Sequence, residues 1–514
     1  MNPVWLQDAV FYEIYPQSFY DSNGDGIGDI NGIRQKLDYI RNLGCNALWL
    51  NPCFDSPFKD AGYDVRDYLT VAPRYGSNED LYRLFAEAHE KGIHVLLDLV
   101  PGHTSEEHPW FLRSKEAQRN EMSDRYIWTD FCFRGAAGMP YIGGESDRDG
   151  CYILNFFKCQ PALNYGFYRC SESWQKPIDD PAALRTREAM KEVMRFWLDH
   201  GCDGFRVDMA DSLVKCDEWD KRGTAEIWRD VRRMLDAEYP EAALVAEWNN
   251  PALAIPAGFH MCFYLNETGN GYSTLMRDYL NGTDRSYFKG DAGGDIRRFL
   301  DQYLDWYDQT KDLGYISMIT CNHDTIRPSK NLSERELKLA YAFLFTMPGV
   351  PFLYYGDEIG MRYLTLPTKE GGYYRTGSRT PMQWQPGKNL GFSTGDPAAL
   401  YLPTDPAPDA PTVAAQEADP DSLLQTVRRL LALRHAQPDL QSDSGFSVLC
   451  DGQDQPFVYR RGALAVAVNP ARSAREAEIP GGADRVLLKI GEVSARGDTL
   501  LLGPQSFAVV APVG

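Results

Sequence analysis

Charged and polar side chains gather at the ends of four short apolar runs in this chain. VLLDLV contains Asp98 and leads to His103, GFRVD carries Arg206 and Asp208, LVAE ends in Glu247, and ISMITCNHD ends in His323 and Asp324. Apolar, β-branched runs of this length are typical of buried strands. A carboxylate at the end of such a strand is costly to bury without a reason. In a parallel barrel the carboxyl ends of all strands meet at one face, so we expect Asp208, Glu247 and Asp324 to share an active site there.

Strand-like and helix-like segments alternate along the chain in the pattern of a (β/α)8 barrel. We predict eight strands, at residues 10–15, 47–50, 95–100, 204–208, 244–246, 261–265, 316–320 and 350–355. The predicted helices are residues 30–43, 78–91, 181–200, 225–238, 295–308, 334–345 and 423–435. The predicted fold class is therefore α/β, with a TIM barrel made of residues 1–101 and 180–440.

Three regions depart from this alternation. Residues 102–179 are rich in Gly, aromatic and charged residues and are too long for a loop, so we predict a subdomain B inserted after strand 3. Short strand-like runs separated by Gly, Pro and Asp predict a C-terminal all-β domain, a β-sandwich of residues 441–514. Residues 395–422, rich in Pro, Asp and Ala, fit a flexible linker and an ordered loop over the barrel mouth equally well.

The composition narrows the possible partners and compartments. The chain has 514 residues and a net charge of −19, which argues against nucleic acid and against anionic membrane surfaces as partners. No stretch is apolar enough for a transmembrane helix, and the N-terminus does not resemble a secretory signal. The 11 Cys show no CxxC spacing and indicate reduced thiols, so we expect a cytoplasmic protein. The sequence does not predict an oligomeric state.

Taken in order, the blocks DLVPGH, GFRVD, AEW and CNHD resemble the signature of glycoside hydrolase family 13, the α-amylase clan. ALWLNP and GVPFLYYGDEIG resemble the second and eighth strands of that family. Within the family, YEIYPQSFYDSNGDGIGD, GYDVRDY and SRTPMQW resemble the oligo-1,6-glucosidase and α-glucosidase group. QPALN at residues 160–164 resembles that group's QPDLN block, with Ala162 in place of the Asp.

This resemblance assigns a role to each polar residue at the strand ends. It implies that Asp208 is the nucleophile of a retaining glycosidase and that Glu247 is the acid/base, which needs a raised pKa. Asp324 would bind the 2- and 3-hydroxyls of the sugar. Arg206 shares a strand face with Asp208, two residues away, and can keep it ionised. His103 and His323 resemble donors to sugar hydroxyls.

Three further residues carry expected substrate contacts. By the same resemblance, Asp64 and Arg379 bind the non-reducing sugar and close the pocket behind it. Tyr63 resembles the aromatic platform under that sugar. The resemblance therefore implies removal of one terminal α-glucose at a time from a small oligosaccharide.

A loop near the N-terminus carries oxygen-bearing side chains at alternate positions. It begins like an EF-hand loop, with Gly26 at the sixth position, but Gly32 replaces the Glu expected at the twelfth. It resembles the small divalent-ion site of the oligo-1,6-glucosidase group, with predicted ligands Asp21, Asn23, Asp25 and Asp29 by side chain and Ile27 by carbonyl. We expect a structural Ca²⁺, or Mg²⁺, and no organic cofactor; the alternative is an Asx-rich turn without metal. Gly102 stands where many α-amylases have an Asn ligand, which argues against a second calcium site.

The sequence therefore predicts a retaining exo-α-glucosidase that acts by double displacement. Two alternatives remain. One is a transglycosylase or isomerase on the same site, such as a trehalose-forming or sucrose-converting enzyme. The other is an inactive relative, like the barrel ectodomains that accompany amino-acid transporters, although this chain retains all three acids. Met209, directly after the proposed nucleophile, and the altered QPALN block leave the preferred linkage open.

Overall fold

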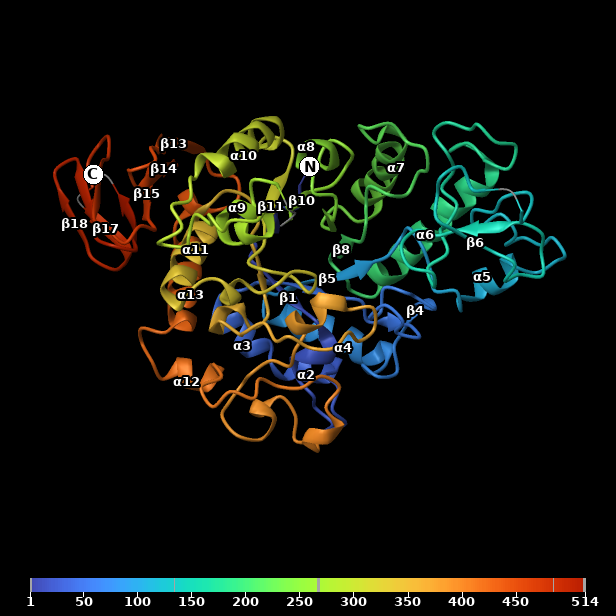
Figure 1. Cartoon of the computed structure of the whole chain (residues 1–514), viewed down its shortest axis with the longest axis horizontal. Coiled ribbons are helices and arrows are strands. Elements are labelled where there is room, and N and C mark those ends of the chain that lie inside the picture. The colour runs from blue at the N-terminus through green and yellow to red at the C-terminus, as the bar shows by residue number, and fades with distance from the viewer. Residues whose placement is uncertain (1, 134, 266–268, 484, 512–514) are drawn as a thin grey trace.

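The computed structural model describes residues 2–133, 135–265, 269–483 and 485–511. Within these residues, the centre of the molecule is a barrel of eight parallel strands (Figure 1), which confirms the predicted fold class. The strands are β1 (Phe11–Ile14), β2 (Ala47–Leu50), β5 (His94–Leu99), β8 (Gly204–Val207), β9 (Ala243–Ala246), β10 (Met261–Tyr264), β11 (Tyr315–Met318) and β12 (Phe352–Tyr354). They are neighbours in that order, β12 pairs with β1, and a bridge between Ile319 and Phe352 closes the ring.

Helices connect these strands and cover the outside of the barrel. The longer ones are α4 (Asn78–Glu90), α6 (Pro181–Asp199), α7 (Arg222–Glu238), α10 (Arg297–Thr310), α11 (Glu334–Thr346) and α13 (Leu423–Ala436). Short helices are α1 (Pro16–Phe19), α8 (Pro251–Ala254), α9 (Ser273–Met276) and α12 (Val413–Glu417). The single helix predicted at residues 30–43 is instead two, α2 (Ile30–Gln35) and α3 (Leu37–Leu43), because the backbone of Lys36 leaves the helical region with φ −108° and ψ 6°.

The chain leaves the barrel after β5 to form the inserted subdomain. This subdomain contains α5 (Pro109–Ser114) and the antiparallel pair of β6 (Tyr141–Gly143) and β7 (Cys151–Ile153). A bridge between His103 and Ala162 ties its far end back to its start. The segment around residues 155–164 therefore returns to the carboxyl face of the barrel. A smaller antiparallel pair, β3 (Phe54–Asp55) and β4 (Asp67–Val71), forms in the connection that follows β2.

Residues 395–422, the segment rich in Pro, Asp and Ala, form an ordered loop that includes α12. The amide of Tyr401 donates a 3.0 Å hydrogen bond to the carbonyl of Gly26, in the loop that follows β1. The side chain of Asn389 donates to the carbonyl of Gly395 at 3.0 Å. The segment thus packs against the loop that carries the predicted ion ligands.

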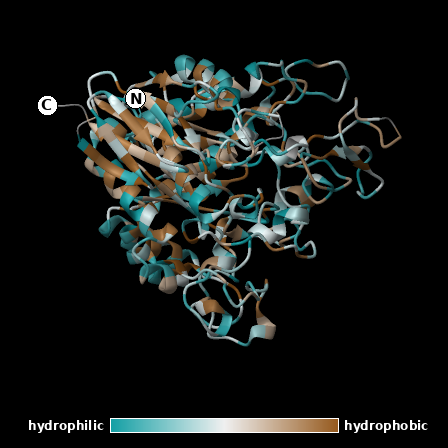
Figure 2. Cartoon of the chain, turned by 60° about the vertical axis from the view of Figure 1, so that its left-hand side comes forward, coloured by the Kyte–Doolittle hydropathy of each residue, from teal (hydrophilic) through white to brown (hydrophobic). Residues whose placement is uncertain are grey.

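The C-terminal domain confirms the predicted all-β fold. Its larger antiparallel sheet has the order β13 (Phe446–Cys450), β14 (Phe457–Arg461), β15 (Leu464–Asn469), β20 (Ser506–Ala511) and β17 (Arg485–Ile490). Its smaller sheet has the order β16 (Arg475–Glu478), β19 (Thr499–Leu502) and β18 (Val493–Arg496). A separate core that includes Val458, Ala467, Leu500 and Val510 fills the space between them. Figure 2 shows predominantly hydrophobic strands beside hydrophilic outer helices, and Figure 1 shows this domain at the opposite end of the molecule from β6. Among the described residues, no helix is long and apolar enough to cross a membrane.

Candidate active site

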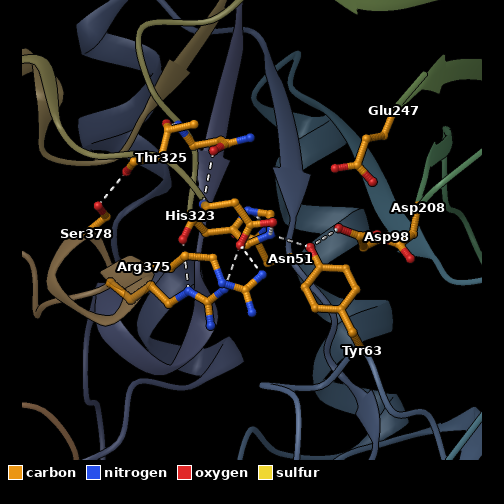
Figure 3. A network of polar contacts seen from close by, with 12 residues as sticks. Asn51, Tyr63, Asp98, Asp208, Glu247, His323, Thr325, Arg375 and Ser378 are labelled. Carbon is orange, nitrogen blue, oxygen red and sulfur yellow. Dashed lines mark hydrogen bonds and ion pairs between the residues drawn. The ribbon is translucent and has the colours of Figure 1, made fainter. Parts of the chain in front are cut away.

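The guanidinium of Arg206 binds three carboxylates at the carboxyl ends of neighbouring strands. Its Nη1 lies 2.8 Å from Oδ1 of Asp98 and 3.0 Å from Oδ1 of Asp208, and its Nη2 lies 2.9 Å from Oε1 of Glu247. Asp98 is opposite Arg206 in the β5–β8 register, Asp208 directly follows β8, and Glu247 directly follows β9. Parallel pairing of these strands therefore brings Arg206, Asp208 and Glu247 together. Figure 3 shows the side chains of Asp98, Asp208 and Glu247 on the same side of the site.

Burial and charge set the protonation of the two proposed catalytic acids. Burial raises the pKa of Asp208 to about 7 and that of Glu247 to about 7, and the charge of Arg206 acts against this in both. The negative charge of Asp208 raises the pKa of Glu247 further. Close acids titrate as a group, so a state with one proton on the Asp208–Glu247 pair is favoured around pH 7. One ionised and one protonated carboxyl is the combination that retaining glycoside hydrolysis needs.

Asp324 is held by two arginines from the segment that follows β12. Its Oδ1 accepts hydrogen bonds from Nη2 of Arg379 at 2.7 Å and from Nη1 of Arg375 at 3.0 Å. Burial alone would raise the pKa of Asp324, but the charges of Arg375 and Arg379 bring that pKa below its usual range. The carboxylate is therefore ionised, and 29% of the side chain is exposed. An open, ionised carboxylate can accept hydrogen bonds from sugar hydroxyls.

His323 and Tyr63 lie between Asp324 and the group of carboxylates that Arg206 binds. Nε2 of His323 lies 2.6 Å from the hydroxyl of Tyr63, which lies 3.1 Å from Oδ2 of Asp98. Nδ1 of His323 faces Oε1 of Glu13 at 2.8 Å and the side-chain amide nitrogen of Asn51 at 3.0 Å. Figure 3 shows Asn51 beside His323. Burial lowers the pKa of His323 well below its ordinary value, so the ring is neutral. The structure thus places His323 and Tyr63 in the site, with their polar atoms bound to protein groups, and their contacts with sugar stay predictions.

His103 lies at the junction of the barrel and the inserted subdomain. Its Nδ1 accepts from the side-chain amide of Asn155 at 3.1 Å, so Nε2 carries the hydrogen and donates to the carbonyl of Tyr63 at 3.2 Å. Burial lowers the pKa of His103 to about 3, and the ring is neutral. The side chain of Asn155 fills the space where a Cβ at Gly102 would lie, 2.7 Å from its nitrogen. A larger residue at position 102 would therefore displace the side-chain amide that orients His103.

Asp64 and Arg379 bind different protein groups in the structure, and their contacts with the sugar stay predictions. Asp64 is fully buried. Its carboxylate accepts hydrogen bonds from Ser56 Oγ at 3.0 Å and from the amides of Lys59 and Asp60 at 2.9 and 3.0 Å, so it holds the turn before Tyr63. Arg379 instead binds Asp324 and the carbonyl of His323.

In the same loop as Asp64, Asp60 is the acid that faces an arginine, Arg375. Its Oδ1 lies 3.5 Å from Nη2 of Arg375, and its Oδ2 accepts from the side-chain amide of Gln160 at 2.7 Å. Burial raises the pKa of Asp60 to about 7, and the charge of Arg375 acts against this. Asp60, Gln160 and Arg375, which we call the glycone wall, lie beside Asp324 and come from three separate segments of the chain.

The loop predicted to bind an ion is held by its own hydrogen bonds. The carboxylates of Asp21, Asp25 and Asp29 accept hydrogen bonds from backbone amides at 2.7–3.2 Å. The Asn23 side chain donates to Asp25 at 3.0 Å. Among the described residues, no three His, Cys, Asp or Glu side chains gather closely enough to hold a metal ion. The loop thus has the hydrogen bonds of an Asx-rich turn, and a structural Ca²⁺ or Mg²⁺ held by Asp21, Asn23, Asp25, Ile27 and Asp29 stays a prediction.

Sequence reasoning missed Glu13, Asn51, Asp60 and Arg375 as parts of the site. Glu13 and Asn51 carried a signal, because one is a charged residue inside a buried strand and the other directly follows one. Asp60 lies in a loop and Arg375 in a short 3-10 helix (Tyr373–Ser378), neither has a periodic pattern, and only the folded chain brings them together.

Comparisons with known proteins agree with this architecture. A family model described as the alpha amylase catalytic domain matches residues 13–443, and one described as a domain of unknown function matches residues 441–509. The chain is 34% identical over 473 residues to the trehalose synthase/amylase of Mycolicibacterium smegmatis, covering 84% of this chain and 76% of that protein. It is 31% identical over 577 residues to the oligo-1,6-glucosidase of Heyndrickxia coagulans, covering 98% and 99%.

A solved structure extends the similarity to three dimensions. The trehalulose synthase MutB from Pseudomonas mesoacidophila MX-45 matches with a TM-score of 0.80 and 25% identity, covering 99% of this chain and 100% of that one. The family model spans most of the chain. It is consistent with the eight-stranded barrel and with the cluster of Arg206, Asp208 and Glu247. The chain belongs to the α-amylase family, glycoside hydrolase family 13.

Proposed function

We propose that this protein is a retaining, exo-acting α-glucosidase that releases terminal α-linked glucose from short oligosaccharides. In the first step, the Asp208 carboxylate attacks the anomeric carbon while the glycosidic oxygen leaves with the proton of Glu247. In the second step, Glu247 takes a proton from water as the water oxygen attacks the same carbon and Asp208 leaves as a carboxylate. Two inversions restore the α-configuration. Asp324 accepts hydrogen bonds from the hydroxyls of the sugar being released.

One observation carries the exo-acting part of this proposal. Arg375 binds Asp324 at 3.0 Å and lies 3.5 Å from Asp60, which Gln160 holds from the inserted subdomain at 2.7 Å. A glucose bound at Asp324 would have this glycone wall next to it. A longer chain on the non-reducing side would meet the wall, whereas a terminal glucose would fit.

A second candidate function uses the same site with a sugar as the acceptor in place of water. It is favoured by the similarity to proteins named trehalose synthase/amylase and trehalulose synthase. Such an enzyme would form the same Asp208 intermediate and transfer glucose to a hydroxyl of the leaving sugar. The difference lies in how well water is excluded while the intermediate lasts.

Time-resolved proton NMR separates these functions. The purified protein is incubated with maltose, isomaltose, sucrose, trehalose and maltotriose, next to an Asp208→Asn variant. Release of α-glucose as the first anomer, absent from the variant, supports the retaining α-glucosidase, and the fastest substrate gives the linkage. A new disaccharide that accumulates ahead of free glucose supports the isomerase. Release of β-glucose as the first anomer would contradict both.

A further inference from the structure

The turn that carries Arg375 has a strained backbone. Glu370, Gly371 and Tyr373 have φ angles of 47°, 63° and 44°. The left-handed region is unfavourable for residues with a side chain, and such conformations persist only where the surroundings hold them. The turn, residues 369–375, lies between the end of the barrel and the segment that binds Asp324. Its shape must therefore be fixed by contacts from other parts of the chain.

Arg74 provides such a contact from the outer side of the turn. Its Nη1 lies 3.1 Å from Oε1 of Glu370, and the side chains are only 24% and 12% exposed. The guanidinium lies over the ring of Phe58 at 3.4 Å and faces the ring of Tyr401 at 5.4 Å. Lys369, the neighbour of Glu370, lies over the same Tyr401 ring at 3.6 Å. A half-buried ion pair flanked by aromatic rings is screened less by water than a surface pair.

The inner side of the turn touches the glycone wall. The carbonyl of Gly371 accepts a 2.7 Å hydrogen bond from Nη2 of Arg375, whose Nη1 binds Asp324. A Cβ at Gly371 would lie 3.2 Å from Oδ1 of Asp60 and 3.3 Å from the ring of Phe157. The backbone at Gly371 is thus packed against the wall, and a shift of the turn would move Arg375 away from Asp60 and Asp324.

We propose that Arg74 is a positioning residue of the active site. By pairing with Glu370 between Phe58 and Tyr401, it holds the strained turn in the shape that lets Arg375 complete the glycone wall. Arg74 thereby sets the preference for a single terminal glucose without touching the substrate. This inference rests on the proposed function and names the contact that enforces its exo-acting character.

The test compares Arg74→Met and Arg74→Lys with a matched control, Arg34→Met. Arg34 is also a half-buried arginine, 22% exposed, and its partner is Glu87 on α4. Hydrogen exchange of residues 366–378 reports on the turn without any substrate. KM and kcat for 4-nitrophenyl α-glucoside report on the glycone site, and a maltoheptaoside blocked at its non-reducing end reports on the wall.

Arg74→Met should speed exchange in the turn about tenfold and raise KM about tenfold, with kcat within about twofold of the unmodified enzyme. It should also begin to cleave the blocked substrate, while Arg74→Lys, which keeps the charge, should give intermediate values. Arg34→Met should change none of these. Glu370→Gln breaks the same pair from the other side and should repeat the result if Arg74→Met folds poorly.

Unchanged exchange and KM in both Arg74→Met and Glu370→Gln would overturn the inference, and so would equal changes in the Arg34→Met control. One other result would contradict only the proposed exo-acting function and not the role of Arg74. If the unmodified enzyme already cleaves the blocked substrate, exo-action fails, while hydrogen exchange still decides whether Arg74 holds the turn.

Discussion

The backbone amide of Met209 donates a 2.8 Å hydrogen bond to Oε2 of Glu247. Met209 directly follows Asp208, and its φ of 42° places it in the left-handed region. The other oxygen of Glu247, Oε1, lies 2.9 Å from Arg206. Both oxygens of the proposed acid/base are therefore held, one by the residue after the proposed nucleophile and one by the arginine before it. Two acids on neighbouring strands thus share one local scaffold.

The pH dependence of the reaction should report the proton on Glu247. Burial raises the pKa of Glu247 to about 7, above its ordinary value of 4.5. The protonated form is the active one in the first step, so kcat/KM for a disaccharide should fall as the pH rises through about 7. In Glu247→Gln this activity should drop about 10²–10⁴-fold, because general acid catalysis is lost. A pH–rate profile from pH 4 to 9 measures both effects.

α-Glucosyl fluoride serves as the control substrate for this prediction, because its leaving group needs little protonation. With this substrate, Glu247→Gln should retain most of its first-step rate and lose the alkaline fall in activity. If the activity of Glu247→Gln still falls at alkaline pH as in the unmodified enzyme, the group that titrates is not Glu247.

Replacing Arg206 should move the acidic side of the same profile. The charge of Arg206 lowers the pKa of Asp208 against the effect of burial. In Arg206→Lys a single ammonium cannot contact Asp98, Asp208 and Glu247 with the same geometry. The pKa of Asp208 should rise, so the nucleophile stays protonated to a higher pH and the acidic limb shifts upward. We expect a loss in kcat/KM of at least about 10²-fold.

Arg327→Lys is the matched control for that variant. Arg327 is fully buried and lies 2.7 Å from Oδ1 of Asp357, whereas the carboxylates of Asp208 and Glu247 are bound by Arg206. It should lower the melting temperature without moving the acidic limb. Equal shifts of the limb in both variants would show that the shift reflects general loosening of the barrel.

The strands and the acids at their ends could be predicted because both are local features of the sequence. An apolar run and the polar residue that ends it are adjacent, and barrel geometry then brings such ends together. The break in the helix predicted at residues 30–43 could not be predicted. Nζ of Lys36 lies 4.1 Å from the ring centres of both Tyr20 and Trp384, and this contact depends on a segment far along the chain.

The same limit explains why the sequence alone did not point to Asp60. Both acids lie in the short stretch KDAGYD, and neither has a periodic neighbour that would indicate its direction. Only the fold shows that Asp64 is used up by Ser56 and two backbone amides, whereas Asp60 faces Arg375. Residues in loops acquire their roles from three-dimensional contacts, and one sequence does not record those contacts.

The predicted structural ion can be tested by thermal unfolding. After dialysis against EDTA, addition of Ca²⁺ or Mg²⁺ should raise the melting temperature if the loop at residues 21–29 binds it. Saturation at 100 times the dissociation constant would stabilise the fold by about 2.7 kcal/mol. Asp25→Asn should abolish this gain, because it removes a charged ligand while keeping an acceptor for the amide of Ile27, which lies 2.9 Å away.

Asp38→Asn, a change at an exposed acid on α3, controls for the loss of one negative charge. It should leave the gain from the ion intact. A melting temperature that responds to neither ion, together with no bound metal by elemental analysis, would leave the loop as a hydrogen-bonded turn.

Arg461 of the C-terminal domain donates a hydrogen bond to the carbonyl of Thr346, the last residue of α11, and should be a stability determinant without a role in catalysis. Carbonyls at a helix C-terminus lack partners within the helix, and a buried cation there supplies both donors and a favourable charge. Arg461 is fully buried, so Arg461→Met should leave that carbonyl unpaired and lower the free energy of unfolding by about 2–4 kcal/mol.

The neighbouring control, Arg460→Met, removes only a bond to the carbonyl of Pro480 at the surface and should lower the free energy of unfolding by less than about 0.5 kcal/mol. Urea unfolding measures both, and kcat/KM below the unfolding transition should be unchanged in each. A parallel loss of kcat/KM in folded Arg461→Met would instead show that the C-terminal domain supports the active site through α11.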